Sequence, residues 1–506
     1  MKAHLMYRDG DFDPQPKLPS NEPALTQDLE LNTLLNAMAR GDEFLFQVAK
    51  QAVLSGLRDD LDTILYRQDI LRDCLRNDSV VRSIHDIAVK TIESRRKHWW
   101  GISSSFPGSI LHSAVELVQM FMGMLGKLKL IADAHSDKFE SDGFTAFFTM
   151  LKTELADEYF AGVQRHLKEL KFREGVLVSA ELGKGNQGTN YVLRKALGTK
   201  PGWLQRIFKR GSSAFTFRIH ERDEAGARAL SELRDRGIHL VANALAQSAD
   251  HILSFFVMLR TELAFYVGCL NLHGRLAQKG EPVCFPVPAP PGVRRHSCVG
   301  LGDVCLALNI EQRVVGNSLD ADGRNLVIIT GANQGGKSSF LRSIGLAQLM
   351  MQCGMFVAAE SFSADLCRGL FTHYKREEDA TMKSGKFDEE LSRMSDIVNA
   401  LTPHSMLLFN ESFAATNERE GSEIARQIVR ALMETSAKVF FVTHLYEFAH
   451  GLSEQKMDNA LFLRAERHAD GRRTFKLLEG EPLQTSFGAD LYEEIFGGAA
   501  ARDGVG

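Results

Sequence analysis

The stretch Gly331-Ala332-Asn333-Gln334-Gly335-Gly336-Lys337-Ser338-Ser339 comes directly after the apolar run Leu326–Thr330. A buried strand followed by a glycine-rich loop that ends in Lys-Ser is the pattern of a nucleotide-binding P-loop. The glycines let backbone N–H groups surround phosphate oxygens, and a helix that starts near Lys337 adds its positive N-terminal end. The stretch therefore predicts that the chain binds a nucleoside triphosphate.

Two side chains of this loop have specific expected roles. Lys337 would reach the β- and γ-phosphates, and the Ser338 hydroxyl would bind Mg²⁺. Asn333 and Gln334 would contribute backbone groups of the loop. The simpler alternative is a glycine-rich turn between an unrelated strand and helix. The lysine and the serine stand where phosphate chemistry needs them, which favours the nucleotide site.

A second buried strand is expected at residues 405–409, and it ends in Asn410 and Glu411. P-loop ATPases place an acid pair here, in which the first acid holds Mg²⁺ and the second polarises the attacking water. In this sequence the first position carries an amide and the second a carboxylate. Asn410 is therefore the candidate metal residue, and Glu411 is the candidate that polarises water.

A third buried strand is expected at residues 439–442, and it delivers Thr443 and His444 to its C-terminal end. A histidine at that place can sense the γ-phosphate. Taken alone, His444 would be a structural histidine at a strand end, but its place after the other two motifs favours a role in the site. Ligands bind at the C-terminal ends of parallel strands, so all three motifs are expected to converge.

These motifs resemble the ATPase domain of the MutS proteins of DNA mismatch repair. Residues 405–421, SMLLFNESFAATNEREG, align without gaps to that family's S-L-V-L-M-D-E-I-G-R-G-T-S-T-Y-D-G. Further similar motifs lie at residues 443–448, at residues 486–488, at Asn317 with Leu319, and, more weakly, at residues 259–266. The resemblance implies an α-helical core and lever domain followed by a P-loop α/β ATPase domain of the ABC type.

The resemblance also implies a function. The expected activity is hydrolysis of ATP, with Mg²⁺, to switch a dimeric DNA clamp related to mismatch repair or recombination. The implied site residues are Glu411 and His444 for catalysis, Gly331, Ala332, Asn333, Gln334, Gly335, Gly336, Lys337, Ser338 and Ser339 for ATP, and Ser338 and Asn410 for the metal. The alternative is a nucleotide-switched scaffold or interaction protein that makes no productive DNA contact.

Three departures from the family pattern shape this expectation. About 25 residues precede the expected helical core, so the mismatch-reading and connector domains have no room, and direct mismatch reading is not expected. The family signature S-T-F-M-V-E, which contacts the partner subunit's nucleotide, appears at residues 385–390 as GKFDEE, unless Ser384 takes the serine's role. The sequence ends 20 residues after Ser486, which leaves out the C-terminal dimerising helices. We therefore expect a homodimer that strengthens with ATP.

The chain is expected to divide into parts that differ in composition. We expect a disordered, proline-rich tail at 1–23, a helical core and lever at 24–280 with a clamp-like insertion near 173–222, a linker at 281–300, the ATPase domain at 301–496 and a tail at 497–506. Five prolines at residues 282–291 mark the linker. Amphipathic helical spacing at residues 111–131 supports the lever.

The composition is that of an intracellular enzyme. The seven cysteines form no C-x-x-C pair, which argues against a zinc ribbon and suits a reducing cytoplasm. The most apolar stretches are interrupted, for example by Arg260 and Glu262, so no membrane span is expected. The formal net charge of −4 gives no overall attraction to nucleic acid, so DNA binding would depend on local patches.

The best local candidate for DNA contact is the stretch 194–222, which is rich in lysine, arginine and aromatic residues. Its basic side chains could neutralise backbone phosphates of branched or single-stranded DNA without reading sequence. MutS proteins place their DNA-embracing clamp at the corresponding position between lever helices. The specific candidates are Lys195, Arg206, Lys209 and Arg210. The alternative is a solvated basic face that covers a small aromatic core.

Overall fold

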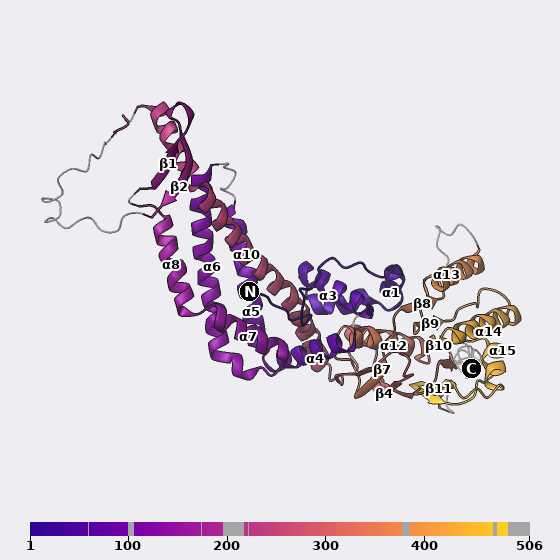
Figure 1. Ribbon diagram of the computed structural model, residues 1–506. Coiled ribbons are helices and arrows are strands. Elements are labelled where there is room, and N and C mark those ends of the chain that lie inside the picture. The colour runs from indigo at the N-terminus through magenta and orange to yellow at the C-terminus, as the bar shows by residue number, and fades with distance from the viewer. Residues whose placement is uncertain are drawn as a thin grey trace, which may run out of the picture. The chain divides into compact units, whose positions relative to one another are not determined.

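The computed structural model describes residues 1–58, 60–99, 106–173, 175–195, 217–220, 222–376, 385–468 and 473–483 (Figure 1). The chain forms two compact units, which are described here one at a time. Unit 1 consists of residues 1–3, 82–139 and 145–260, and unit 2 consists of residues 4–81, 140–144 and 261–506.

Unit 2 contains a six-stranded sheet with the strand order β12-β11-β6-β10-β9-β8. Its strands are β6 (Leu326–Thr330), β8 (Leu370–Tyr374), β9 (Met406–Asn410), β10 (Lys438–Val442), β11 (Ala460–Arg467) and β12 (Arg473–Glu479). Neighbouring strands are parallel from β8 to β11, and β12 runs antiparallel at the edge. The central strands are continuous apolar runs because both faces of a parallel sheet are covered.

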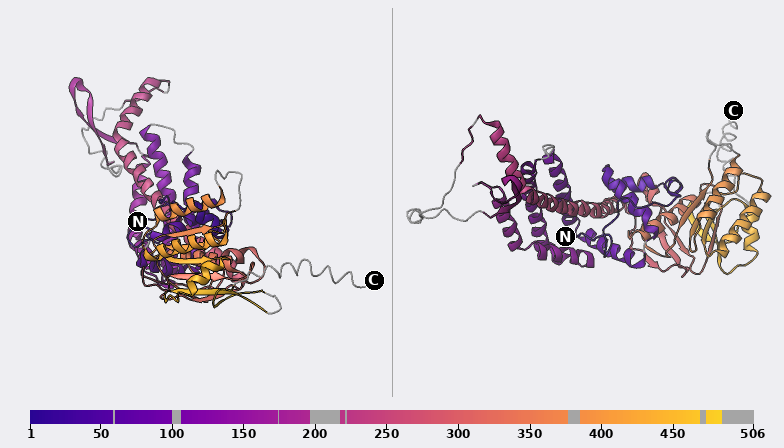
Figure 2. Two further views of the ribbon diagram at one scale, coloured as in Figure 1. Left: turned by 90° about the vertical axis from the view of Figure 1, so that its right-hand side faces the viewer. Right: turned by 45° about the horizontal axis from the view of Figure 1, so that its top comes forward.

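Helices connect and cover these strands, and this part of the chain is drawn in colours from salmon to yellow in Figure 2. They are α12 (Lys337–Gln352), α13 (Lys386–Ala400), α14 (Glu418–Glu434) and α15 (Tyr446–Ser453). One hydrophobic core lies between the sheet and three of these helices, and it includes Phe409, Phe441, Val429 and Phe448. The α/β architecture expected from the sequence is therefore present, as parallel strands that alternate with helices.

A second sheet of unit 2 has four strands in the order β3-β7-β4-β5. The strands are β3 (Val287–Ala289), β4 (His296–Leu301), β5 (Asn317–Asp320) and β7 (Ser361–Asp365), and the short helix α11 (Val304–Asn309) follows β4. The expectation of a linker at 281–300 is therefore wrong, because this interval supplies β3 and most of β4. The prolines are compatible with a strand here because β3 lies at the edge of the sheet, where proline is tolerated.

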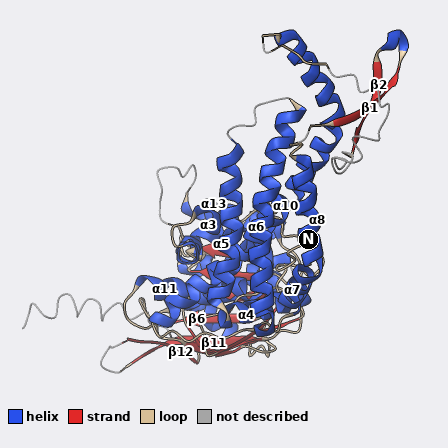
Figure 3. Cartoon of the chain, turned by 90° about the vertical axis from the view of Figure 1, so that its left-hand side faces the viewer, coloured by secondary structure: helices blue, strands red, loops and turns tan. Residues whose placement is uncertain are grey.

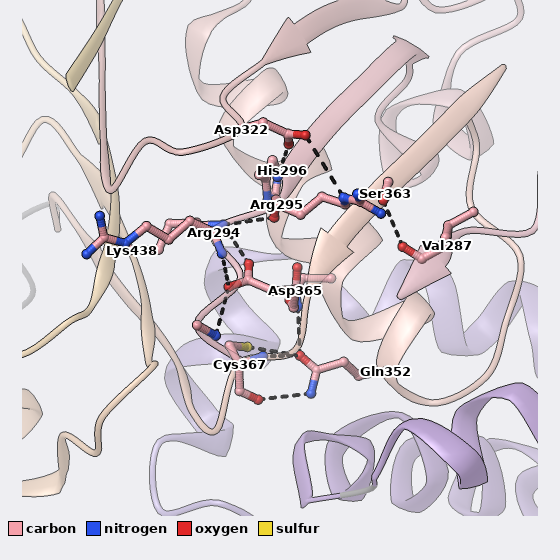
Figure 4. Close-up of polar contacts among 12 residues, drawn as sticks. Val287, Arg294, Arg295, His296, Asp322, Gln352, Ser363, Asp365, Cys367 and Lys438 are labelled. Carbon is pink, nitrogen blue, oxygen red and sulfur yellow. Dashed lines mark hydrogen bonds and ion pairs between the residues drawn. The ribbon is translucent and has the colours of Figure 1, made fainter. Parts of the chain in front are cut away.

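A buried polar network lies where β7 of the second sheet meets the start of β10 (Figure 4). The ammonium group of Lys438 lies 2.6 Å from a carboxylate oxygen of Asp365 and donates to the carbonyl oxygen of Arg295 at 2.9 Å. The other carboxylate oxygen of Asp365 accepts the backbone N–H groups of Gly292 and Arg294. The network fastens the two sheets of unit 2 to each other.

The N-terminal part of unit 2 is helical, as expected. Its elements are α1 (Glu22–Asp28), α2 (Leu31–Ala39), α3 (Glu43–Ser55), the 3₁₀ turn η1 (Gly56–Arg58) and α4 (Leu61–Arg76). The aspartates Asp42 and Asp60 cap α3 and α4 by accepting backbone N–H groups of the first turn.

Residues 4–20 are packed and hydrogen-bonded, so the expectation of a disordered tail over 1–23 is wrong. Leu5 and Phe12 are buried, and the carboxylate of Glu262 accepts their backbone N–H groups at 2.6 and 3.1 Å. The Tyr266 hydroxyl donates to the carbonyl oxygen of Leu5. Burial raises the pKa of Glu262 to about 7. The polar, proline-rich composition suggested disorder, but the segment is held by buried Leu5 and Phe12 and by hydrogen bonds to Glu262, which is distant in sequence.

Unit 1 is built from long helices and one hairpin. The elements are α5 (Asp78–Trp99), α6 (Pro107–His135), η2 (Ser136–Lys138), α7 (Asp142–Glu154), α8 (Asp157–Leu170), β1 (Leu177–Leu182), η3 (Lys184–Asn186), β2 (Gly188–Arg194) and α10 (Glu224–Gln278). The first residues of α5 and α7 belong to unit 2, and α10 runs on into unit 2. Among the described residues of unit 1 the strands are β1 and β2, an antiparallel pair (Figure 3). This hairpin falls within residues 173–222, where a clamp-like insertion was expected from the sequence.

Helix α10 is 55 residues long, and within the described chain it is the one helix long and apolar enough to cross a bilayer. No membrane-spanning segment was expected from the sequence. In the structure 78% of its apolar window is buried inside the molecule, as in the core helix of a soluble protein. The burial accounts for the apolar composition of α10 without a membrane.

Candidate nucleotide-binding site

The P-loop lies between β6 and α12 and depends on two glycines. Gly331 has a φ of +120°, and a Cβ atom there would lie 2.8 Å from the backbone nitrogen of Ala465 on β11. Gly336 has a φ of +85° and is the N-cap of α12. Residues other than glycine rarely adopt either backbone conformation, so both positions favour glycine. These two glycines allow the tight loop that joins β6 to the start of α12 at Lys337.

Lys337 is the first residue of α12, and its side chain is 4% exposed. Its ammonium group donates to the carbonyl oxygens of Gly331 and Ala332, each at 2.9 Å. Burial lowers the pKa of Lys337 to about 8, and the nearby charge of Glu411 opposes this shift. A buried ammonium whose hydrogen-bond acceptors are neutral carbonyls is poorly stabilised, so an anion that binds beside it would stabilise its charge.

The two candidate metal residues meet at the end of β9. The Ser338 hydroxyl donates to the side-chain oxygen of Asn410 at 3.0 Å. Asn410 lies beside Val442 of β10 in the sheet, next to the strand that leads to His444. A hydroxyl and an amide oxygen are hard ligands, and Mg²⁺ takes few protein ligands beside waters and phosphate oxygens, so these residues fit the ion. Both are neutral, so the ion would gain less attraction than from a carboxylate.

Glu411 and His444 form a direct pair. Nε2 of His444 lies 2.9 Å from a carboxylate oxygen of Glu411. The Glu411 backbone N–H donates to the carbonyl oxygen of Val442, which ties the residue to β10. The hydrogen bond from His444 lowers the pKa of Glu411, although burial opposes this shift. Glu411 is consequently ionised at neutral pH and can accept a proton.

A cavity of about 430 Å³ lies against these groups. Its polar lining includes P-loop residues 333–339 and Glu411. Its apolar lining includes Leu306, Ile310, Val314, Val315, Phe340 and Phe475. The volume and the combination of polar and apolar side chains suit a nucleotide, which has charged phosphates and a largely apolar base. Four of the predicted site residues do not line the cavity but hydrogen-bond to lining residues. Gly331 and Ala332 accept from Lys337, Asn410 accepts from Ser338, and His444 contacts Glu411.

Phe475, which lines this cavity, was not predicted from the sequence. Phe475 on β12 lies against Gly336, and Arg473 of the same strand donates to the side-chain oxygen of Gln334. Asn317, which carried the family resemblance, holds β12 in place by donating to the carbonyl oxygen of Phe475 and accepting the N–H of Leu477. The motif at Asn317 was a signal for the site, whereas nothing in the sequence marked β12.

The candidate DNA residues are only partly described. Lys195 is exposed, and its ammonium group lies 3.8 Å from a carboxylate oxygen of Glu169 in unit 1. Arg206, Lys209 and Arg210 lie outside the described residues, as do Ser384 and residues 486–488. The altered signature is described from Gly385, which is the N-cap of α13.

Comparison with known proteins places the two parts of the chain in one family. The family model for the MutS2 N-terminal domain matches residues 59–279, and the model for MutS domain V matches residues 327–496. The chain is 34% identical over 178 residues to a DNA mismatch repair protein MutS of Porphyromonas gingivalis, which covers 34% of this chain and 20% of that protein. It is 32% identical over 143 residues to the human MutS protein homolog 4, which covers 28% of this chain and 15% of that protein. The matched region is thus a small part of either relative. The agreement of both family models with the fold and the P-loop site leads to one conclusion: the chain is a member of the MutS family.

Proposed function

We propose that the chain binds ATP with Mg²⁺ in the cavity beside the P-loop and hydrolyses it. The observation that carries this proposal is the convergence of Lys337, Ser338, Asn410, Glu411 and His444 at one edge of the six-stranded sheet. Mismatch-repair proteins appear among the matched relatives, and MutS proteins are ATPases.

Each residue has a role that follows from its contacts. Lys337 exchanges its two loop carbonyls for phosphate oxygens, and the loop N–H groups share the phosphate charge. Glu411, kept ionised by His444, accepts a proton from the attacking water. His444 responds to the γ-phosphate because it touches the same carboxylate. Ser338 and Asn410 would hold Mg²⁺, which would neutralise charge on the phosphates.

The hydrolysis is proposed to switch an ATP-dependent homodimer that embraces DNA through backbone contacts. The family membership supports this, together with the exposed hairpin β1–β2 of unit 1. We further propose that the chain does not read mismatches directly. Residues 4–20 of this sequence pack on the helical part of the chain through Glu262 and Tyr266. The localisation consistent with this function is cytoplasmic.

A nucleotide-switched scaffold without productive DNA contact is the second candidate. One observation favours it: the described candidate Lys195 lies within 4 Å of Glu169, which offsets its charge. Branched, single-stranded, mismatched and matched DNA distinguish the two functions, because only a DNA-coupled ATPase binds or responds to any of them.

The test measures ATP binding and hydrolysis by the full chain, with and without these DNA forms at fixed salt. Lys337→Ala should abolish nucleotide binding, because the loop loses its side-chain cation, whereas Glu411→Gln should bind ATP without hydrolysing it. A mismatch preference of about tenfold, or about 1.4 kcal/mol, contradicts the absence of direct mismatch reading. Sedimentation of Glu411→Gln with and without Mg-ATP tests the dimer, and a monomer in both conditions refutes it.

A further inference from the structure

The turn that carries Glu411 is held in an unfavourable backbone conformation. Glu411 has a φ of +55° and Phe413 a φ of +63°, although neither is glycine. Each left-handed residue of this kind costs about 1 kcal/mol or more. Such a conformation persists only where the surrounding structure holds it, so the contacts of residues 411–413 decide where the Glu411 carboxylate points.

Ser412, between these two residues, is fully buried and is fastened to β8. Its hydroxyl oxygen lies 2.7 Å from Nδ1 of His373 and 2.5 Å from the carbonyl oxygen of the same residue. The His373 ring also stacks on Phe413, with ring centroids 5.2 Å apart and planes 19° apart. A Cβ atom at Gly421 of α14 would lie 2.3 Å from the carbonyl oxygen of Phe413, so α14 closes the other side of the turn.

The opposite edge of the same imidazole contacts helix α13. Nε2 of His373 lies 3.0 Å from the carbonyl oxygen of Glu390. Glu390 is the last residue of the segment GKFDEE at 385–390. This segment resembles the signature that contacts the partner subunit's nucleotide in MutS proteins. One buried side chain, 1% exposed, therefore touches both the turn that carries Glu411 and the helix that begins in the altered signature.

The protonation of the ring follows from its surroundings. Burial lowers the pKa of His373 to about 4, with the nearby arginines adding to the shift, so the ring is neutral at pH 7. A neutral imidazole has one N–H, and the Glu390 carbonyl can only accept. The Glu390 carbonyl requires the tautomer that carries its proton on Nε2, and Nδ1 is then an acceptor. The Ser412 hydroxyl has one hydrogen, which it shares between Nδ1 and the carbonyl oxygen of His373. Each contact therefore depends on a different nitrogen.

We propose that His373 is a positioning residue for hydrolysis, which fixes the Glu411–Phe413 turn through Ser412 and ties it to α13 through Glu390. The inference rests on the proposed ATPase function. A movement of α13 at its signature end changes the hydrogen bond at Nε2, and the ring passes that change to the turn. Neither His373 nor Ser412 lines the cavity, so their substitution leaves the nucleotide contacts in place.

The test separates ATP affinity from the single-turnover hydrolysis rate in His373→Phe, His373→Asn and Ser412→Ala. His373→Phe keeps a ring against Phe413 but loses both hydrogen bonds of the imidazole. Ser412→Ala loses the hydroxyl contacts to Nδ1 and to the carbonyl oxygen of His373, with little change in volume. Both should slow hydrolysis on the order of 10–100-fold, as a misplaced catalytic group does, with the dissociation constant for ATP changed by less than about threefold. His373→Asn, which can still accept the Ser412 hydroxyl near the place of Nδ1, should recover part of the rate.

The double variant His373→Phe/Ser412→Ala provides the control for a merely structural role. Two changes that act through one turn should be non-additive, whereas independent losses of stability would add. Unchanged hydrolysis in Ser412→Ala, equal losses of affinity and rate, or additive effects would each overturn the positioning role. A wild-type chain that binds ATP but does not hydrolyse it would instead refute the proposed function on which this role rests. Thermal melting confirms that each variant is folded.

Discussion

Two buried lysines lie at opposite ends of neighbouring central strands of the six-stranded sheet, and their partners differ. Lys438 begins β10 and pairs with the carboxylate of Asp365 at 2.6 Å, beside a cavity of about 70 Å³ (Figure 4). Lys337 follows the C-terminal end of β6 and donates to the carbonyl oxygens of Gly331 and Ala332, beside the cavity of about 430 Å³. Within the described part of the chain, the hydrogen-bond acceptors of one ammonium include a carboxylate, whereas those of the other are neutral carbonyls.

This difference distinguishes a structural lysine from a binding one. Burial costs an ammonium much of its hydration, and a carboxylate partner returns part of that free energy. The burial of Lys438 is offset in this way, so the residue fastens the two sheets. Lys337 is not offset in the same way, and its pKa falls to about 8. The cost of burying Lys337 is recovered when an anion such as a phosphate arrives.

The largest expected effect is on stability at Lys438. Lys438→Ala should lower the free energy of unfolding by about 3–5 kcal/mol, because it leaves the buried Asp365 carboxylate without its cation. Lys337→Met should leave the free energy of unfolding unchanged or raise it, because it removes a desolvated charge that has no carboxylate partner. Urea denaturation of both variants measures the contrast.

The matched control replaces both members of the ion pair. Lys438→Met combined with Asp365→Asn should recover much of the stability lost in Lys438→Ala, since no uncompensated charge remains. The folded fraction of each Lys438 variant should still bind ATP as the wild type does. Equal losses of stability at Lys337 and Lys438 would contradict the distinction between the two lysines.

The contrast also shows which parts of the molecule could be predicted from sequence. The P-loop, the strands that end at Asn410 and Val442, and helix α6 are local patterns of burial and spacing, and they were predicted. The Asp365–Lys438 pair joins residues 73 positions apart, and no local pattern connects them. The same holds for Phe475 in the cavity and for Glu262 beneath residues 4–20. These contacts depend on the tertiary fold, which periodicity does not encode.

A smaller effect concerns the pH dependence of ATP binding. Below pH 8 Lys337 is already charged, whereas above its pKa of about 8 binding must also take up a proton. The affinity for ATP should therefore be about tenfold lower at pH 9 than at pH 7, which corresponds to about 1.4 kcal/mol. Calorimetric titration at several pH values measures the slope. The Lys438→Met variant should show the same curve, and a flat curve in the wild type would mean that Lys337 is not the group that titrates.

The smallest expected effect is at Asn410, whose side-chain oxygen lies 3.0 Å from the Ser338 hydroxyl. An amide keeps the oxygen of an aspartate but lacks its negative charge, so Mg²⁺ should be held weakly and turnover should be slow. Asn410→Asp adds about 1 kcal/mol of attraction for the ion, and the Mg²⁺ concentration for half-maximal hydrolysis should fall about fivefold. Asn417→Asp is the matched control, because Asn417 caps α14 without lining the cavity and aspartate caps a helix equally well. If both variants keep the Mg²⁺ dependence of the wild type, Asn410 does not tune the metal, and Glu411 and Ser338 compensate for its missing charge.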